Sequence, residues 1–349
     1  MSLTRVCKRL SILACCLLPL AATYSGFAAD QSGPYKVEAR WKIGGDGGWD
    51  YLTADPQAHL LYLTHGPRVE IVDTKSGKPV GSITGLQGTH GVALDDQGKY
   101  GYISDGKANV VVIFDRHTFK TVASIPAGTN PDGIVYEPVT KTVWAFNGRS
   151  SDATVIDTAT QKVVSTIKLP GKPEFPVADG TGTVFVNIET KNEIVRLNAK
   201  TLESTATWPL AGCESPSGLA IDRLHRRLFS VCDGKKMAIT DADSGKSLAT
   251  PTIGDGPDAA GYDPAHRLAF SSNGDGTLTV VNTASDKFDV IQNLATAPGA
   301  RTMSFDSATD RIYLVTAEFG PRPPATAQNQ HPRPPVLPGS FTVLVVGRN

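Results

Sequence analysis

The stretch Asn130-Pro131-Asp132-Gly133-Ile134-Val135-Tyr136-Glu137-Pro138 decides the fold of this chain, together with Val155-Ile156-Asp157-Thr158 a short distance later. Versions of this phrase recur about every 42 residues, a repeat length typical of a β-propeller blade. One such unit cannot bury its own apolar faces, so the repeats must stack on one another. The recurrence therefore predicts a closed ring of blades.

Seven repeats align, and each gives a short apolar strand that ends in an acid. These acids are Asp55, Asp95, Glu137, Asp179, Asp222, Asp263 and Asp306. Turn-forming residues follow them, so we expect the carboxylates to accept backbone hydrogen bonds in Asx-type turns. Three more short strands follow in most repeats. Alternating strands without a helical period predict an all-β architecture.

The two ends of the chain complement each other. The seventh repeat stops three residues after its third strand, Phe341 to Val346, and an unassigned strand, Val37 to Ile43, precedes the first repeat. If the N-terminal strand completes the last blade, no sheet edge is left open. We therefore predict one seven-bladed β-propeller of four-stranded blades over residues 35–349, with a Pro-rich loop insertion at 318–340.

The first residues resemble a targeting segment. Bases between positions 5 and 9 precede an apolar run that ends at Ala22, and small residues follow at 26–28. This order is typical of a secretory signal peptide, which we assign to residues 1–28. A lipoprotein cut before Cys15 is the alternative, although it would truncate the apolar run. We expect a mature chain that is periplasmic or secreted, has no membrane span and is a monomer.

The charge and cysteine content of the chain limit the kinds of partner and cross-link to be expected. The chain has 34 bases and 34 acids, and removing the three bases of the signal peptide leaves a net charge of −3. No block of Lys or Arg stands out, so we expect no nucleic-acid partner. Cys213 and Cys232 are the cysteines left after the signal peptide, and in an oxidising compartment they predict a disulfide. A soft-metal site is the alternative.

The repeats resemble those of a known family. Pro131-Asp132-Gly133-Ile134 with Ile156-Asp157-Thr158-Ala159-Thr160, and Tyr62-Leu63-Thr64, are similar to the repeats of the YVTN-repeat, YncE-like exported bacterial β-propellers. The resemblance covers nearly the whole mature chain, and the namesake tetrapeptide is degraded, as in Tyr102-Ile103-Ser104-Asp105. It implies a periplasmic seven-bladed propeller and carries over no catalytic residue.

Alignment on the hairpin acids also places one residue of each repeat, five positions earlier, in common register. These residues are Asp50, His90, Asp132, Glu174, Ser217, Asp258 and Arg301. The innermost strands of a propeller start at the mouth of the central channel, so the seven side chains should converge there. Charges are costly to concentrate where water is restricted. We therefore predict a ligand-binding site, with Trp49, Tyr51 and Phe175 as an apolar wall; packing between blades is the alternative role of these aromatics.

Neighbour order around the ring suggests how its charges are offset. Arg301 lies between Asp258 and Asp50 and is expected to bridge them. His90 lies between Asp50 and Asp132, which favours a charged imidazole or a metal-bound one.

Asp132 and Glu174 follow each other without a cation between them. A shared proton or a bound divalent metal ion is therefore expected, with His90, Asp132 and Glu174 as candidate ligands. Two other interpretations stay open: rim charges that are merely solvated, and an ion with a structural role.

Two functions compete. The first is an exported binding or scaffold propeller that presents its charged channel mouth to a small molecule, a metal ion or a periplasmic partner protein. The alternative is a metal-assisted hydrolase or lyase at the same mouth. Motifs for covalent haem, zincins and α/β-hydrolases do not occur, and no catalytic residue is assigned. The Pro-rich insertion is interpreted as a lid or docking arm, or as a loop without either role.

Overall fold

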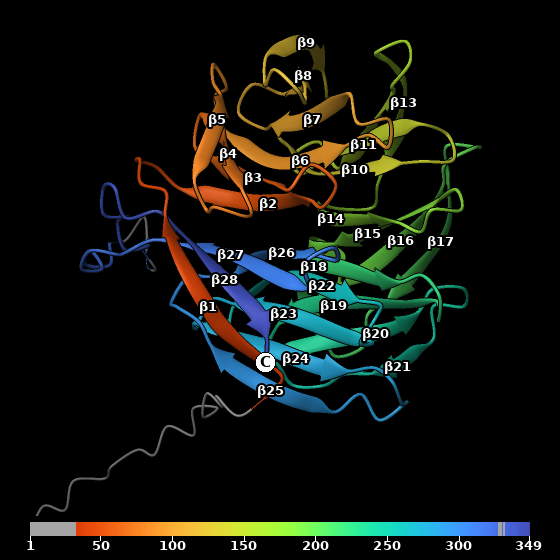
Figure 1. The fold of residues 1–349 in the computed structure, drawn as a ribbon. Coiled ribbons are helices and arrows are strands. Elements are labelled where there is room, and N and C mark those ends of the chain that lie inside the picture. The colour runs from red at the N-terminus through yellow and green to blue at the C-terminus, as the bar shows by residue number, and fades with distance from the viewer. Residues whose placement is uncertain (1–32, 327–329, 331) are drawn as a thin grey trace, which may run out of the picture.

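Seven four-stranded antiparallel sheets surround a central channel (Figure 1). The computed structural model describes residues 33–326, 330 and 332–349, so the predicted signal peptide lies outside the described residues. Within them the only helical element is a single 3₁₀ turn, Glu189–Lys191, and no helix is long and apolar enough to cross a membrane. The predicted all-β, seven-bladed propeller is confirmed.

The blades are numbered here from the one that begins with β2 to the one that begins with β26, and the strands are given from the channel outward. The innermost strands are β2 (Trp49–Asp55), β6 (Thr89–Leu94), β10 (Pro131–Glu137), β14 (Pro173–Ala178), β18 (Glu214–Asp222), β22 (Pro257–Asp263) and β26 (Thr302–Asp306). The second strands are β3 (Leu60–His65), β7 (Tyr100–Asp105), β11 (Thr142–Asn147), β15 (Thr183–Ile188), β19 (Arg227–Asp233), β23 (Leu268–Asn273) and β27 (Arg311–Thr316).

The third strands are β4 (Arg68–Asp73), β8 (Val110–Asp115), β12 (Asp152–Asp157), β16 (Glu193–Asn198), β20 (Lys236–Asp241), β24 (Thr277–Asn282) and β28 (Thr342–Arg348). The outermost strands are β5 (Pro79–Ile83), β9 (Thr121–Pro126), β13 (Lys162–Lys168), β17 (Glu203–Pro209), β21 (Ser247–Ala249), β25 (Val290–Ala295) and β1 (Tyr35–Lys42).

The ring is closed by the N-terminal strand, as the incomplete seventh repeat predicts. Strand β1 pairs antiparallel with β28, from Tyr35 opposite Arg348 to Lys42 opposite Thr342. Each innermost strand contacts the next around the ring, and β26 contacts β2. In Figure 1 the first and last strands accordingly lie side by side in one blade. Closure fixes the seven strand starts around one channel.

Apolar side chains are buried mainly between blades. Tyr62 and Ile71 of blade 1, for example, share a cluster with Val92 and Ile103 of blade 2. Because each blade covers the faces of its neighbours, the core is a set of radial layers around the ring. The channel surface is then left to the innermost strands.

The hairpin acids form the expected turns. Each of the seven accepts at least one backbone N–H from the turn that follows it; Asp95, for instance, accepts from Lys99 and Tyr100 at 3.1 Å each. All seven acids therefore have a structural role, which is to stabilise the turn after the first strand of each blade.

A disulfide joins Cys213 to Cys232, with 5.3 Å between their Cα atoms. Cys213 precedes β18 and Cys232 lies on β19, so the bond ties the start of one inner strand to the second strand of the same blade. The predicted pairing is confirmed.

The Pro-rich insertion has an ordered stem. Phe319 and Val336 form an isolated antiparallel bridge, flanked by hydrogen bonds from Gly320 N to Pro335 O and from Leu337 N to Glu318 O, each 2.8 Å. Gly339 N also donates to Gly45 O at 2.9 Å, which attaches the stem to the segment before β2. The described ends of the insertion are therefore fixed beside the channel mouth.

Candidate functional site

The residues predicted to form a ring lie at irregularities of the innermost strands. In six of the seven blades the pairing of the first strand with the second shifts at this point, for example between Pro131 and Ile134. Such bulges turn a side chain out of the ladder and are common next to binding sites. At Gly133 the bulge also brings blades close, because a Cβ there would lie 2.5 Å from Glu174 O. The repeat thus builds a channel mouth, defined here as Asp50, His90, Asp132, Glu174, Asp258 and Arg301.

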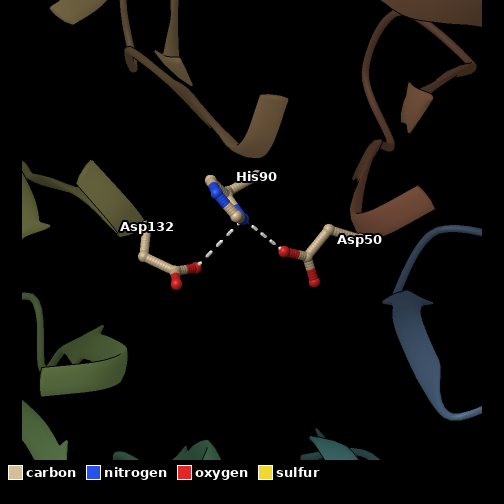
Figure 2. A group of neighbouring side chains, drawn as sticks. All are labelled: Asp50, His90 and Asp132. Atoms are coloured by element: carbon tan, nitrogen blue, oxygen red, sulfur yellow. Dashed lines mark hydrogen bonds and ion pairs between the residues drawn. The ribbon is translucent and has the colours of Figure 1, made fainter. Parts of the chain in front are cut away.

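His90 lies between two carboxylates from the neighbouring blades. Its Nδ1 is 2.6 Å from Asp50 Oδ2 and 3.6 Å from Asp132 Oδ1. Figure 2 shows the three side chains pointing toward one another, with the imidazole shared by both acids. Their ligand atoms all lie within 4.8 Å of one another, close enough to hold one metal ion. The structure therefore gives the predicted order Asp50, His90, Asp132.

Burial and charge set the protonation of this group. Burial opposes the imidazolium of His90, but its hydrogen bond to Asp50 and the charges of Asp132 and Asp50 outweigh burial and raise its pKa to about 9. Burial also raises the pKa of Asp50, and His90 partly offsets this. For Asp132, burial and then the charge of Asp50 raise the pKa to about 6. At neutral pH the group holds a proton on the imidazole.

Glu174 has a cation beside it, which corrects one prediction. Lys172 Nζ pairs with Glu174 and lies 2.5 Å from Glu189 Oε2. Burial opposes the charge of Lys172, but the two carboxylates hold its pKa above the ordinary value. The pKa of Glu174 is still raised to about 8, first by burial and then by the charge of Asp132. Lys172 was missed because it lies in the loop before β14, outside the repeat register.

Arg301 pairs with one of its two predicted partners. Its Nε lies 3.2 Å from Asp258 Oδ2, while no ion pair links it to Asp50, so the predicted bridge is wrong. Arg301 precedes β26 and lacks the bulge that re-aims the other ring residues. Ser217 links two blades: its Oγ donates a hydrogen bond to Pro257 O at 3.2 Å.

An aromatic pair fills the channel axis. Tyr51 of blade 1 and Phe175 of blade 4 meet edge to face, with ring centroids 4.9 Å apart. These blades are not neighbours, so the two rings can meet only across the channel. Each follows a charged ring residue, Asp50 or Glu174, by one position. The apolar wall predicted from the sequence is a plug, and its formation depends on the diameter of the ring.

The hydroxyl of Tyr51 lies near the carboxylates of the channel mouth. The residue is 6% exposed. Its pKa is raised well above the ordinary value, first by burial and then by the charges of four carboxylates from four blades: Asp132, Asp50, Glu174 and Asp258. A single phenol can sense all four only near the centre of the channel mouth. Within the described part of the chain, no hydrogen bond occupies this hydroxyl.

Two cavities open at the same face and share Gly48 and Trp49. One, of about 580 Å³, is lined by Asp50 and His90 together with the loops of blades 1 to 3. The other, of about 470 Å³, lies beneath the Pro-rich insertion and reaches Arg301. Trp49 separates them, with its ring 6.1 Å from Phe319 and 5.5 Å from Phe341.

Polar residues at the ends of the second strands, around the channel mouth, serve the fold. Asp105 accepts backbone hydrogen bonds from Gln87 and Gly88 at 2.9 and 2.8 Å. Asn147 donates to Asp152 at 2.8 Å. His65 is fully buried and stacks on Phe341 at 4.1 Å between ring centroids. These side chains fix the loops around the channel mouth.

A second acidic group lies at turns between first and second strands, the opposite face of the ring. Asp263, His266 and Asp310 also place their ligand atoms within 4.8 Å of one another. Asp263 accepts the backbone N–H groups of Ala265 and His266 at 2.9 and 3.2 Å, so its geometry is explained by the turn.

The channel mouth holds more acidic than basic side chains. Among the described residues, four carboxylates lie at the mouth, those of Asp50, Asp132, Glu174 and Asp258. Three cations pair with them, namely His90, Lys172 and Arg301. Lys172 also pairs with Glu189, so acids outnumber cations. Burial raises the pKa of each of the four acids. A bound cation would reduce their mutual repulsion, and the oxygens with the His90 nitrogen form a donor set for a divalent metal.

Comparison with known proteins agrees with this architecture. The class defined by the fold is the seven-bladed β-propeller with a charged channel mouth. Residues 28–177 match the model of the YNCE-like beta-propeller family. This part of the chain is therefore similar to the YNCE-like propellers, and the seven blades agree with that likeness. A search of curated proteins gave no match.

Solved structures share the fold at low sequence identity. Hydrazine synthase of Kuenenia stuttgartiensis is 14% identical with a TM-score of 0.69, covering 85% of this chain and 95% of that one. U3-55K is 11% identical with a TM-score of 0.73, covering 89% and 98%. The WD40 repeats of RRP9 are 11% identical with a TM-score of 0.74, covering 91% and 99%. At these identities the likeness shows the fold alone.

Proposed function

We propose that this chain is an exported binding propeller that holds a small cationic ligand, foremost a divalent metal ion, at its channel mouth. The observation that carries the proposal is the convergence of four carboxylates with raised pKa values, two of them buried and two half-buried, next to an aromatic plug. Bound metal would take Asp50, His90 and Asp132 as ligands and displace the proton of the imidazole. Export is supported by the signal-like start of the sequence and by the disulfide.

An organic cation is the second form of such a ligand. Phe175 is half-buried and packs against the buried ring of Tyr51 next to the carboxylates, and aromatic rings beside acids are the combination that recognises quaternary ammonium groups. A rigid ring with one polar mouth suits a binding protein that catalyses no reaction, because its site is formed before the ligand arrives.

Calorimetric titration with Zn²⁺, Mn²⁺ and choline at pH 7.5 tests the proposal. We expect one site per chain for at least one of these probes. Asp50→Asn with Asp132→Asn removes two of the converging charges without changing size and should weaken binding at least about tenfold. The matched control is Asp233→Asn with Glu214→Gln, two exposed acids on the same face, which should leave affinity unchanged. Absence of binding for all three probes would refute a cation site.

One observation favours a hydrolase or lyase as the second candidate. The pKa values of Asp132 and Glu174, about 6 and about 8, lie on either side of neutrality, as in an acid and base pair. If the metal-loaded protein hydrolyses p-nitrophenyl phosphate or acetate, Glu174→Gln should abolish turnover and retain the metal. Turnover that survives Glu174→Gln would exclude Glu174 from that role.

A further inference from the structure

The cavity beneath the Pro-rich insertion differs in charge from the channel mouth beside it. Its volume is about 470 Å³, within the range of small-molecule sites. Apolar rings and side chains alternate in its wall with guanidinium groups. The residues that matter here are Trp49, Phe319, Val336, Arg301, Arg322 and Arg333.

The apolar wall is held in place by the fold. The bridge between Phe319 and Val336 fixes both arms of the insertion. Phe319 lies against Gly299, which has φ +76°, and a Cβ there would come within 2.7 Å of the ring. Trp49 packs from the other side, with 6.1 Å between its ring centroid and that of Phe319. The rings therefore form a preformed surface.

The three arginines of this cavity have fewer carboxylate partners than positive charges. Arg301 pairs through Nε with Asp258, at the edge of the channel mouth. Arg322 Nη1 donates to Pro332 O at 3.3 Å, which ties the two arms of the insertion together. In the described part of the chain no ion pair links Arg322 or Arg333 to a carboxylate, and no acid lines the cavity. Three cations thus converge with one paired acid behind them.

We infer that this cavity binds an organic carboxylate with a flat apolar body. Guanidinium groups recognise carboxylates through paired, charge-assisted hydrogen bonds, and they are weakly hydrated, so they lose little on contact with aromatic surface. The body of the ligand would cover Trp49 and Phe319, and its carboxylate would face Arg322 and Arg333. This site adjoins the cation site proposed at the channel mouth and shares Trp49 and Arg301 with that region, but the two proposals do not depend on each other.

Calorimetric titration of the full chain with 1-naphthoate tests the inference. We expect saturable binding at one site per chain. The neutral analogue 1-naphthalenemethanol should bind at least about tenfold more weakly, because it lacks the charge that the arginines recognise. Arg322→Gln with Arg333→Gln should weaken 1-naphthoate by about tenfold or more and leave the alcohol unchanged. Both arginines are exposed, so the propeller is kept, and unchanged binding of the alcohol shows that the insertion keeps its shape without the hydrogen bond from Arg322.

Arg149→Gln with Lys107→Gln is the matched control. These two exposed bases line the other cavity on the same face, so the pair removes as much charge without touching the proposed site. It should leave 1-naphthoate affinity within about twofold. Three results would overturn the inference: no saturable binding of 1-naphthoate, equal binding of the alcohol, or equal losses in the two double variants.

Discussion

Replacing His90 by glutamine should destabilise the protein in acid and not in base. In the folded chain the pKa of His90 is raised to about 9, against 6.5 for an ordinary histidine. A raised folded pKa adds stability that is complete below pH 6.5 and is lost as pH rises through 9. At 1.36 kcal/mol per pKa unit this gives an upper limit of about 3 kcal/mol.

Two effects reduce that limit. The His90 side chain is 26% exposed, so solvent screens its contacts. Asp50 and Asp132 can also bind a proton once the imidazolium is gone, which relieves their repulsion. We therefore expect His90→Gln to cost about 1–2 kcal/mol at pH 6 and less than about 0.5 kcal/mol at pH 10.

Urea unfolding of the wild type and of His90→Gln at both pH values measures these losses. His117→Gln is the control, because His117 is exposed in a turn between outer strands. It should change the free energy of unfolding by less than about 0.5 kcal/mol at either pH. A loss for His90→Gln that is the same at pH 6 and pH 10 would refute the assignment of a charged imidazole between two acids.

Three further changes test other parts of the structure. Glu174→Gln should raise the free energy of unfolding by about 1 kcal/mol at pH 9 and leave it unchanged at pH 4, because a pKa raised from 4.5 to about 8 in the folded chain costs stability that grows between these two pH values and is complete above pH 8; greater stabilisation at pH 4, measured by urea unfolding, would contradict this. Cys213→Ala with Cys232→Ala should cost about 3 kcal/mol in thermal and urea unfolding, whereas equal stability of the oxidised wild type and the variant would show that the bond adds nothing. Tyr35→Ala should cost about 3–5 kcal/mol, because this fully buried ring joins the closing strand to Phe270 of blade 6, and a loss below about 1 kcal/mol would argue against closure by β1.

The repeat was sufficient to predict the architecture. Its period set the number of blades, the missing strand of the seventh repeat predicted closure by β1, and the acid that ends each first strand predicted its turn. The register also placed Asp50, His90 and Asp132 next to one another. Residues at the same position of each repeat lie at the same level along the channel axis once the ring closes.

Features outside the register could not be predicted in the same way. Lys172 acts on Glu174 from an irregular loop, and no periodic rule places it there. The contact of Tyr51 with Phe175 depends on the width of the channel, a property of the whole ring. Arg301 has no bulge to turn it toward Asp50, and a pattern of residue types does not show how a strand begins.

The most direct test of a cation site at the channel mouth is an NMR titration of ¹⁵N-histidine-labelled protein, with the His90 signal assigned by its loss in His90→Gln. We predict a His90 pKa of about 9 in metal-free protein, and a fall below 7 when Zn²⁺ is added and competes for the same nitrogen. A His90 signal that titrates near 6.5 and does not respond to Zn²⁺ would contradict it.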